Sequence, residues 1–182
     1  MLRRGILSYA HRMRVDSAHR RIAALPEEVF RAFQDPGLLA AWLPPEGMHA
    51  HLEHFDLRAG GGFRTVLTYE THDSPGKYSV NTDVTDTKIV AMIPPRRIVW
   101  SVQFPSDDAA FAGTMFMEWS FESVLSDDPD QTPGSQVHAD VGTEVTVQAK
   151  DVPSGIDAAE HVAGLQSSLG KLAALFEHRR PH

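Results

Sequence analysis

The sequence predicts an α+β protein in which a curved antiparallel β-sheet wraps around one long C-terminal helix. Three observations indicate this fold class: two short helical segments follow the first strand-like segment, residues of alternating polarity run from about 49 to 149, and an amphipathic segment ends the chain. Alternating polarity is typical of strands that are covered on one face only. The order of strand, two helices, about six strands and a long helix therefore predicts a sheet that closes around the last helix.

The first elements are a strand and two short helices. Residues 14–22, RVDSAHRRI, are typical of a strand. Pro26, followed directly by two glutamates, begins a helix whose apolar residues lie on one side. Asp35 is the expected cap of a second helix, which the Pro44–Pro45 pair ends.

The middle of the chain alternates between apolar and polar residues. In the segment MFMEWSFE, Met115, Met117, Trp119 and Phe121 share one face. The segments IVWSVQF and VHADVGTEVTVQA alternate in the same way, which predicts a sheet with one apolar face. Turn-forming residues separate the strands at 58–62, 73–77, 94–96, 105–113 and 126–135.

The last segment, SGIDAAEHVAGLQSSLGKLAALFEHRR, is expected to form the long helix. Ser154 is its expected N-cap, with Asp157 three residues later as the partner in a capping box. Apolar residues recur at helical spacing after that point and make one stripe. They are Leu165, Leu169, Leu172 and Phe176.

The length of 182 residues fits a single domain. We expect this domain at residues 14–179 and a poorly structured N-terminal tail at residues 1–13, with translation starting at Met1 or Met13. The sequence leaves the oligomeric state open, and a homodimer is one possibility.

The composition excludes several classes of function. The net charge of −7 weighs against binding nucleic acid, because phosphates need a basic face. The chain has no cysteine, which excludes disulfides and thiolate chemistry, and no apolar run approaches the roughly 20 residues that span a membrane. We therefore expect a cytoplasmic protein without a nucleic-acid partner, a membrane partner or a cofactor.

Three consecutive glycines, Gly60, Gly61 and Gly62, follow a histidine-rich segment. A phosphate-binding loop would need its glycines between a strand and a helix, with a lysine or a helix N-terminus facing the anion. Here the glycines lie between two predicted strands and no lysine follows directly. The triplet is therefore interpreted as a hairpin turn that needs a positive φ angle.

The segment HAHLE before this turn leaves two alternatives. On a strand, His49, His51 and Glu53 share a face with Phe55 and Leu57, which is expected to be the concave face. In that case His51 and Glu53 enter a cavity, with His49 near its rim; otherwise the histidines lie at the surface. A zinc site would need a third ligand, and since the sequence identifies none, no metal site is expected.

Five segments occur in the order found in one protein family: PEEVFRAFQDPGLLAAWLPPEGM, DLRAGGGFR, PPRRIVWS, GTEVTV and HVAGLQSSLGKLAALF. Over about residues 15–178 the chain resembles the heat-shock protein 90 ATPase activator homologue family of the START-like (SRPBCC, birch-allergen-like) superfamily. The resemblance implies the helix-grip fold, in which a sheet curls around a C-terminal helix and leaves an apolar cavity between them. This chain departs from the family at Leu165, where a tryptophan is common.

The resemblance also implies where a ligand would lie. His161 is expected at the cavity mouth, either as an ordinary helix histidine bonded to backbone or water or as a ligand anchor or general acid–base group. Aromatic and methionine side chains suit the wall of a cavity with variable contents. The expected cavity residues are Trp42, His51, Glu53, Phe63, Trp100, Met115, Met117, Trp119, Phe121, His161 and Leu165.

Three functions follow from the resemblance. The first is binding of an apolar or aromatic small molecule as a partner in the cavity. The second is an enzyme of the polyketide cyclase or aromatase type, which would need His161 to converge with His51 or Glu53. The third is a co-chaperone of heat-shock protein 90; it ranks last because the eukaryotic activators carry a further N-terminal domain, for which the sequence before residue 14 leaves no room.

Overall fold

The computed structural model describes residues 14–70, 81–125 and 141–177. The predicted tail at 1–13 and the predicted turns at 73–77 and 126–135 lie outside these residues, as do Val137 and Ala139 of the predicted last strand.

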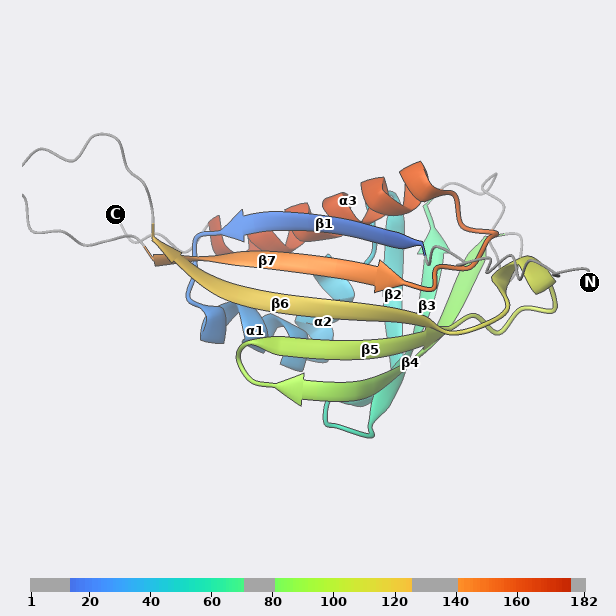
Figure 1. The fold of residues 1–182 in the computed structure, drawn as a ribbon, viewed down its shortest axis with the longest axis horizontal. Helices are drawn as coiled ribbons and strands as arrows, with labels where there is room; N and C mark the ends of the chain where they lie inside the picture. The colour runs from blue at the N-terminus through green and yellow to red at the C-terminus, as the bar shows by residue number, and fades with distance from the viewer. Residues whose placement is uncertain (1–13, 71–80, 126–140, 178–182) are drawn as a thin grey trace, which may run out of the picture.

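A seven-stranded antiparallel sheet forms the framework and confirms the predicted fold class (Figure 1). Its strand order is β1-β7-β6-β5-β4-β3-β2, so the first two strands of the chain form its two edges. The strands are β1 (Val15–Ile22), β2 (Met48–Asp56), β3 (Gly62–Tyr69), β4 (Thr82–Ile93), β5 (Arg97–Gln103), β6 (Met115–Leu125) and β7 (Val141–Lys150).

The helices pack against the concave side of this sheet. Two short helices follow β1, and the long helix that ends the described chain lies along β1, as Figure 1 shows. The helices are α1 (Pro26–Gln34), α2 (Pro36–Trp42) and α3 (Ala158–Glu177), with a 3-10 turn, η1 (Ala109–Phe111), between β5 and β6. Within the described residues, no helix is long and apolar enough to span a bilayer.

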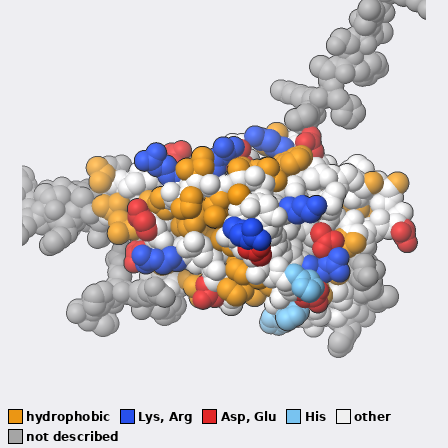
Figure 2. All heavy atoms as spheres, turned by 90° about the horizontal axis from the view of Figure 1, so that it is seen from below, with side chains coloured by type: hydrophobic (Ala, Val, Ile, Leu, Met, Phe, Trp, Pro, Cys, Tyr) orange, Lys and Arg blue, Asp and Glu red, His pale blue; other side chains and the backbone are white. Residues whose placement is uncertain are grey.

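The alternation in β6 was predicted correctly. Met115, Met117, Trp119 and Phe121 are all buried, while Phe116 on the opposite face is exposed. The face that carries these four side chains is the concave one. The side of the molecule seen in Figure 2 carries basic and acidic side chains interspersed with hydrophobic ones.

The cap of α2 agrees with the sequence, whereas the predicted cap of α3 is wrong. Asp35 accepts a hydrogen bond from the backbone N–H of Leu38 at 2.9 Å, as an N-cap does. In α3 the N-cap is Asp157, whose carboxylate accepts from the N–H of Glu160 at 3.0 Å. Ser154 cannot begin the helix because the next two amides bond elsewhere, Gly155 to Ala110 and Ile156 to Pro153.

The aromatic core centres on Phe33 of α1. Its ring lies 4.6 Å from that of Trp42, 5.2 Å from that of Trp119 and 5.0 Å from that of Phe121, centroid to centroid. The Trp42 indole N–H donates to the carbonyl of Ala32 at 3.0 Å, which satisfies a buried polar group. The predicted apolar stripe of α3 is confirmed, because Leu165, Leu169, Leu172 and Phe176 are all buried.

Candidate functional site

A pocket of about 650 Å³ lies between the concave face of the sheet and the first half of α3. This volume falls within the usual range for small-molecule sites, roughly 300–1,000 Å³. Apolar side chains make most of its wall: Leu43, Met48, Leu67, Trp100, Val102, Phe104, Met115, Met117, Trp119, Ile156, Ala163 and Leu165.

The pocket lies where the helices do not fill the concave side of the sheet. The bulky side chains of α1 and α2 fill one part of the concave side around Phe33. The pocket instead meets α3 over residues 160–168, where Gly164 faces it. Leu165 belongs to this wall, and its side chain is smaller than the tryptophan that the family resemblance implies at this position.

Six of the predicted cavity residues line this pocket: Trp100, Met115, Met117, Trp119, His161 and Leu165. Trp42, Phe63 and Phe121 are buried too, but in the aromatic core, and they do not belong to the lining. Phe63 packs between Phe55 and Trp100, at centroid distances of 5.8 and 5.5 Å.

His51 and Glu53 do not line the pocket, and their predicted orientation is wrong. His51 is exposed and is paired with Val66 of β3. Met48 of the same strand is paired with Tyr69, and Met48 and Tyr69 both line the pocket. Since directly opposed residues on antiparallel strands share a face, the residues alternating with His51 face inward.

A β-bulge in β2 is the reason for this error. The pairing of β2 with β3 shifts register between Glu53 and Asp56, and His54 has a positive φ angle of 54°. A bulge adds one residue to one strand, so the inward face passes from one parity to the other. Phe55 therefore points inward against Phe63, although His51, four residues earlier, points outward.

The hairpin interpretation of the glycine triplet is confirmed. Gly60 has a φ angle of 83°, in the region that glycine adopts without strain. Gly61 and Gly62 are required for a different reason: a Cβ on them would collide with the backbone oxygens of Asp56 and Thr87, respectively. The loop joins β2 to β3, so it lacks the helix that a phosphate loop needs.

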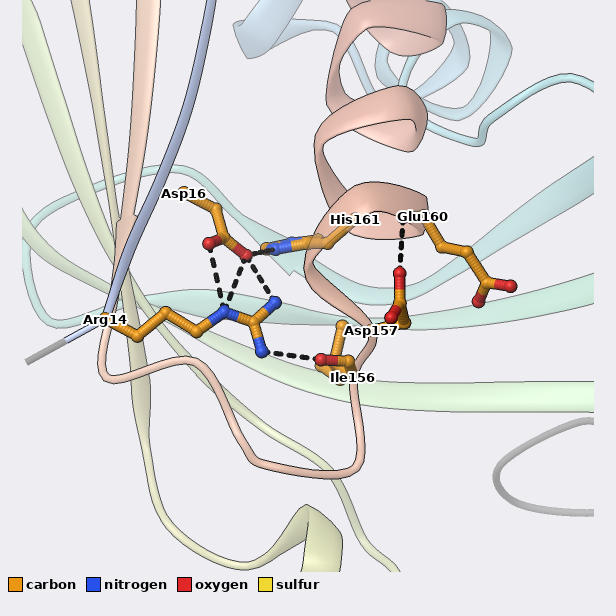
Figure 3. Close-up of polar contacts among 6 residues, drawn as sticks. All are labelled: Arg14, Asp16, Ile156, Asp157, Glu160 and His161. Atoms are coloured by element: carbon orange, nitrogen blue, oxygen red, sulfur yellow. Dashed lines mark hydrogen bonds and ion pairs between the residues drawn. The ribbon is translucent and has the colours of Figure 1, made fainter.

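At the polar end of the pocket, the lining residue His161 belongs to a network that joins β1 to α3 (Figure 3). His161 on α3 places Nδ1 2.8 Å from Oδ2 of Asp16 on β1. Arg14 binds the same carboxylate through Nε at 3.0 Å and Nη2 at 2.6 Å, and its Nη1 donates to the carbonyl of Ile156 at 2.6 Å. The network therefore fixes the start of α3 against the edge of the sheet.

The charges in this network stabilise one another. The hydrogen bonds from Arg14 lower the pKa of the Asp16 carboxyl below its ordinary value, against the opposing effect of burial, and His161 adds to the lowering. The same pair raises the pKa of Arg14. Asp16, whose side chain is only 5% exposed, is thus held as a carboxylate.

Sequence reasoning missed Arg14 and Asp16 as parts of the site. Asp16 and His161 are 145 positions apart in the sequence, so no local motif joins them. One signal was present: Asp16 has the same strand parity as Ala18 and Ile22, both buried. A charged residue at an inward position of an amphipathic strand indicates a buried partner.

Further polar groups surround the pocket. The Tyr69 hydroxyl donates to Oδ2 of Asp83 at 2.9 Å, and burial, followed by Asp83, raises the pKa of this phenol. Glu46, Asp157 and Glu160 also line the pocket, whereas no lysine or arginine of the described segments does. The side chain of Ser168 is already engaged, because it donates to the carbonyl of Leu43 at 2.6 Å.

Among the described residues, the histidines of β2 do not belong to any group of three possible metal ligands. His49 lies 3.2 Å from Glu70, and both side chains are more than half exposed. Across the described segments, no three His, Asp or Glu side chains are grouped so that they could hold a metal ion. The convergence that a cyclase-type reaction would need, His161 with His51 or Glu53, is also not formed, since only His161 lines the pocket.

A curved antiparallel sheet, a long C-terminal helix and an apolar pocket between them define a helix-grip protein. Residues 23–132 match the model of the family described as Activator of Hsp90 ATPase homolog 1-like protein. The chain belongs to this family, as the five sequence segments predicted. A search of curated proteins found no match.

Solved structures share the fold. A protein of Chromobacterium violaceum is 28% identical with a TM-score of 0.70, and the alignment covers 90% of this chain and 96% of that one. The AHSA1 protein of Silicibacter pomeroyi is 19% identical, with a TM-score of 0.64 and coverages of 89% and 96%. CalU16 of Micromonospora echinospora is 18% identical, with a TM-score of 0.54 and coverages of 91% and 78%. These likenesses are to the fold.

Proposed function

We propose that this protein binds an apolar or aromatic small molecule in the pocket between the sheet and the first half of α3. The observation that carries the proposal is the pocket itself, with a volume of about 650 Å³ and a mostly apolar wall. Burial of apolar ligand surface against such a wall contributes roughly 25 cal/mol per Å² before the costs of association.

The wall is suited to ligands of variable shape. Met115 and Met117 flank the pocket side by side with Trp100 and Trp119. Methionine side chains are flexible and polarisable, so they adapt to different outlines, while the buried indoles add rigid apolar surface behind them. The protein therefore favours a neutral, largely apolar molecule over a charged one.

A panel of neutral aromatic compounds tests this proposal by thermal shift and native mass spectrometry. We expect at least one compound to raise the melting temperature and to appear as a one-to-one complex. Leu67, on β3 and in the pocket wall, gives the control: Leu67→Trp should fill the pocket and abolish the shift. Thr68→Trp, at the next and exposed position of the same strand, should leave it intact. A panel without any stabilising compound would contradict the proposal.

A further inference from the structure

Building on the proposed function, we propose that the ligand carries a neutral hydroxyl group, which donates a hydrogen bond to Nε2 of His161. The pocket would thus select an apolar alcohol or phenol over the matching hydrocarbon and over the matching carboxylate. This selection depends on which nitrogen of His161 remains for a ligand and on the charges around it.

The hydrogen-bond partner of His161 determines its tautomer. Its Nδ1 lies 2.8 Å from Oδ2 of Asp16, within hydrogen-bond distance. Asp16 is paired with Arg14 at 2.6 Å, so it is a carboxylate and can only accept hydrogen bonds. The proton between them therefore sits on Nδ1, and in the neutral imidazole Nε2 is left as an acceptor.

The surroundings of His161 decide what is available to Nε2. His161 lines the pocket, and its side chain is 14% exposed. Figure 3 shows the ring reaching from α3 towards Asp16, and because that contact engages Nδ1, Nε2 is the ring nitrogen that remains for a ligand. Within the described part of the chain, the structure records a hydrogen bond for Nδ1 of this ring and none for Nε2. An acceptor at a pocket wall is satisfied by a ligand that donates, and a hydroxyl does so.

The acceptor is held rigidly by its neighbours. Arg14 binds Asp16 through two nitrogens and also donates to the carbonyl of Ile156, just before α3. The imidazole is thus held by a carboxylate that is itself held at two points. Asp16 acts as a positioning residue: it fixes the tautomer and the ring plane without lining the pocket.

The charges at the pocket disfavour anionic ligands. Glu46, Asp157 and Glu160 line the pocket, and among the described residues no lysine or arginine lines it to compensate a second negative charge. These three residues are exposed, so they give the pocket an acidic rim, which disfavours a carboxylate ligand, as does the acceptor nitrogen of His161. A neutral hydroxyl avoids that repulsion and keeps the hydrogen bond.

Three probes with the same ring system separate these cases: 2-naphthol, naphthalene and 2-naphthoate. Binding is measured by calorimetry at about pH 8, above the range in which histidine usually titrates. We expect naphthol to bind roughly tenfold more tightly than naphthalene, the effect of one well-made hydrogen bond, and naphthoate to bind weakest. His161→Leu should abolish the preference for naphthol, and His51→Leu, the same change at an exposed histidine outside the pocket, should keep it.

A nuclear magnetic resonance measurement tests the tautomer without a ligand. In the long-range proton–nitrogen spectrum of the imidazoles, His161 of the wild type should show a pyridine-type Nε2 and a pyrrole-type Nδ1. Asp16→Asn, in which the amide can also donate to Nδ1, should change this pattern, and the preference for naphthol should fall with it. A pyrrole-type Nε2 in the neutral wild-type ring would overturn the inference.

The outcomes distinguish the inference from the function on which it rests. Equal binding of naphthol and naphthalene, or a preference that survives His161→Leu, would leave the pocket a binding site and overturn the hydroxyl assignment. Failure of all three probes to bind would overturn both. A preference for naphthol that is lost in His161→Leu and kept in His51→Leu supports it.

Discussion

Replacement of Asp16 by asparagine tests whether the Arg14–Asp16–His161 network stabilises the fold. The change preserves shape but removes the charge that Arg14 and His161 both contact, at 2.6 and 2.8 Å. Hydrogen bonds to charged groups contribute about 1.5–3 kcal/mol each. Asparagine keeps one acceptor oxygen and the Arg14 side chain is 29% exposed, so the cost stays below that of breaking a fully buried pair.

These contributions predict a loss of about 2–3 kcal/mol in the free energy of unfolding at neutral pH. For a chain of this size the melting temperature should fall by about 5–10 °C. The effect depends on pH because the pKa of Asp16 is lower in the folded than in the unfolded protein. Its stabilisation is complete above the unfolded value, near 3.9, and is lost as the pH falls through the folded value.

Urea denaturation at about pH 7 and about pH 3 measures both effects. The matched control is Asp86→Asn, which breaks an ion pair of similar length, 2.7 Å to Arg64, between side chains that are 45% and 40% exposed. This control should cost no more than about 1 kcal/mol. The reasoning is refuted if Asp16→Asn costs no more than the control, or if its cost is the same at both pH values.

Two further pairs of variants test the local structure. Gly62→Ala should cost more than about 3 kcal/mol in urea denaturation, because its Cβ would collide with the Thr87 carbonyl, and unchanged stability would refute the turn geometry. Gly170→Ala should stabilise α3 by up to about 1 kcal/mol, since the nearest atom outside the helix backbone lies 3.9 Å from its Cβ position. Asp157→Ala should cost about 1 kcal/mol through loss of the N-cap, whereas Ser154→Ala should cost less than about 0.5; the reverse order would restore Ser154 as the cap.

The sequence predicted features that depend on local periodicity. The alternation around Trp119 places the inward face of β6, and Asp35 before Pro36 marks the start of α2. Both follow from rules that act over a few residues, where the side-chain period of a strand or the free amides of a helix start leave few alternatives. The same applies to Gly60, whose place between two strands already indicated a turn.

The errors arise where one residue changes the period or where distant segments meet. The orientation of His51 depends on a bulge three residues later, and a single inserted residue reverses the parity on which the prediction relied. The partner of His161 lies 145 positions away on β1, so only the fold brings Asp16 to it. The family resemblance supplied the fold and the place of His161 but not this partner.

The most direct test of the pocket is a fluorescence titration with Nile red, a neutral dye that emits strongly in apolar surroundings. Wild type, Leu67→Trp and Thr68→Trp are compared at equal protein concentration. We expect a saturable rise in emission with wild type and Thr68→Trp, and a loss of most of it with Leu67→Trp, whose new side chain occupies the pocket. Equal titration curves for all three proteins would contradict binding in this pocket.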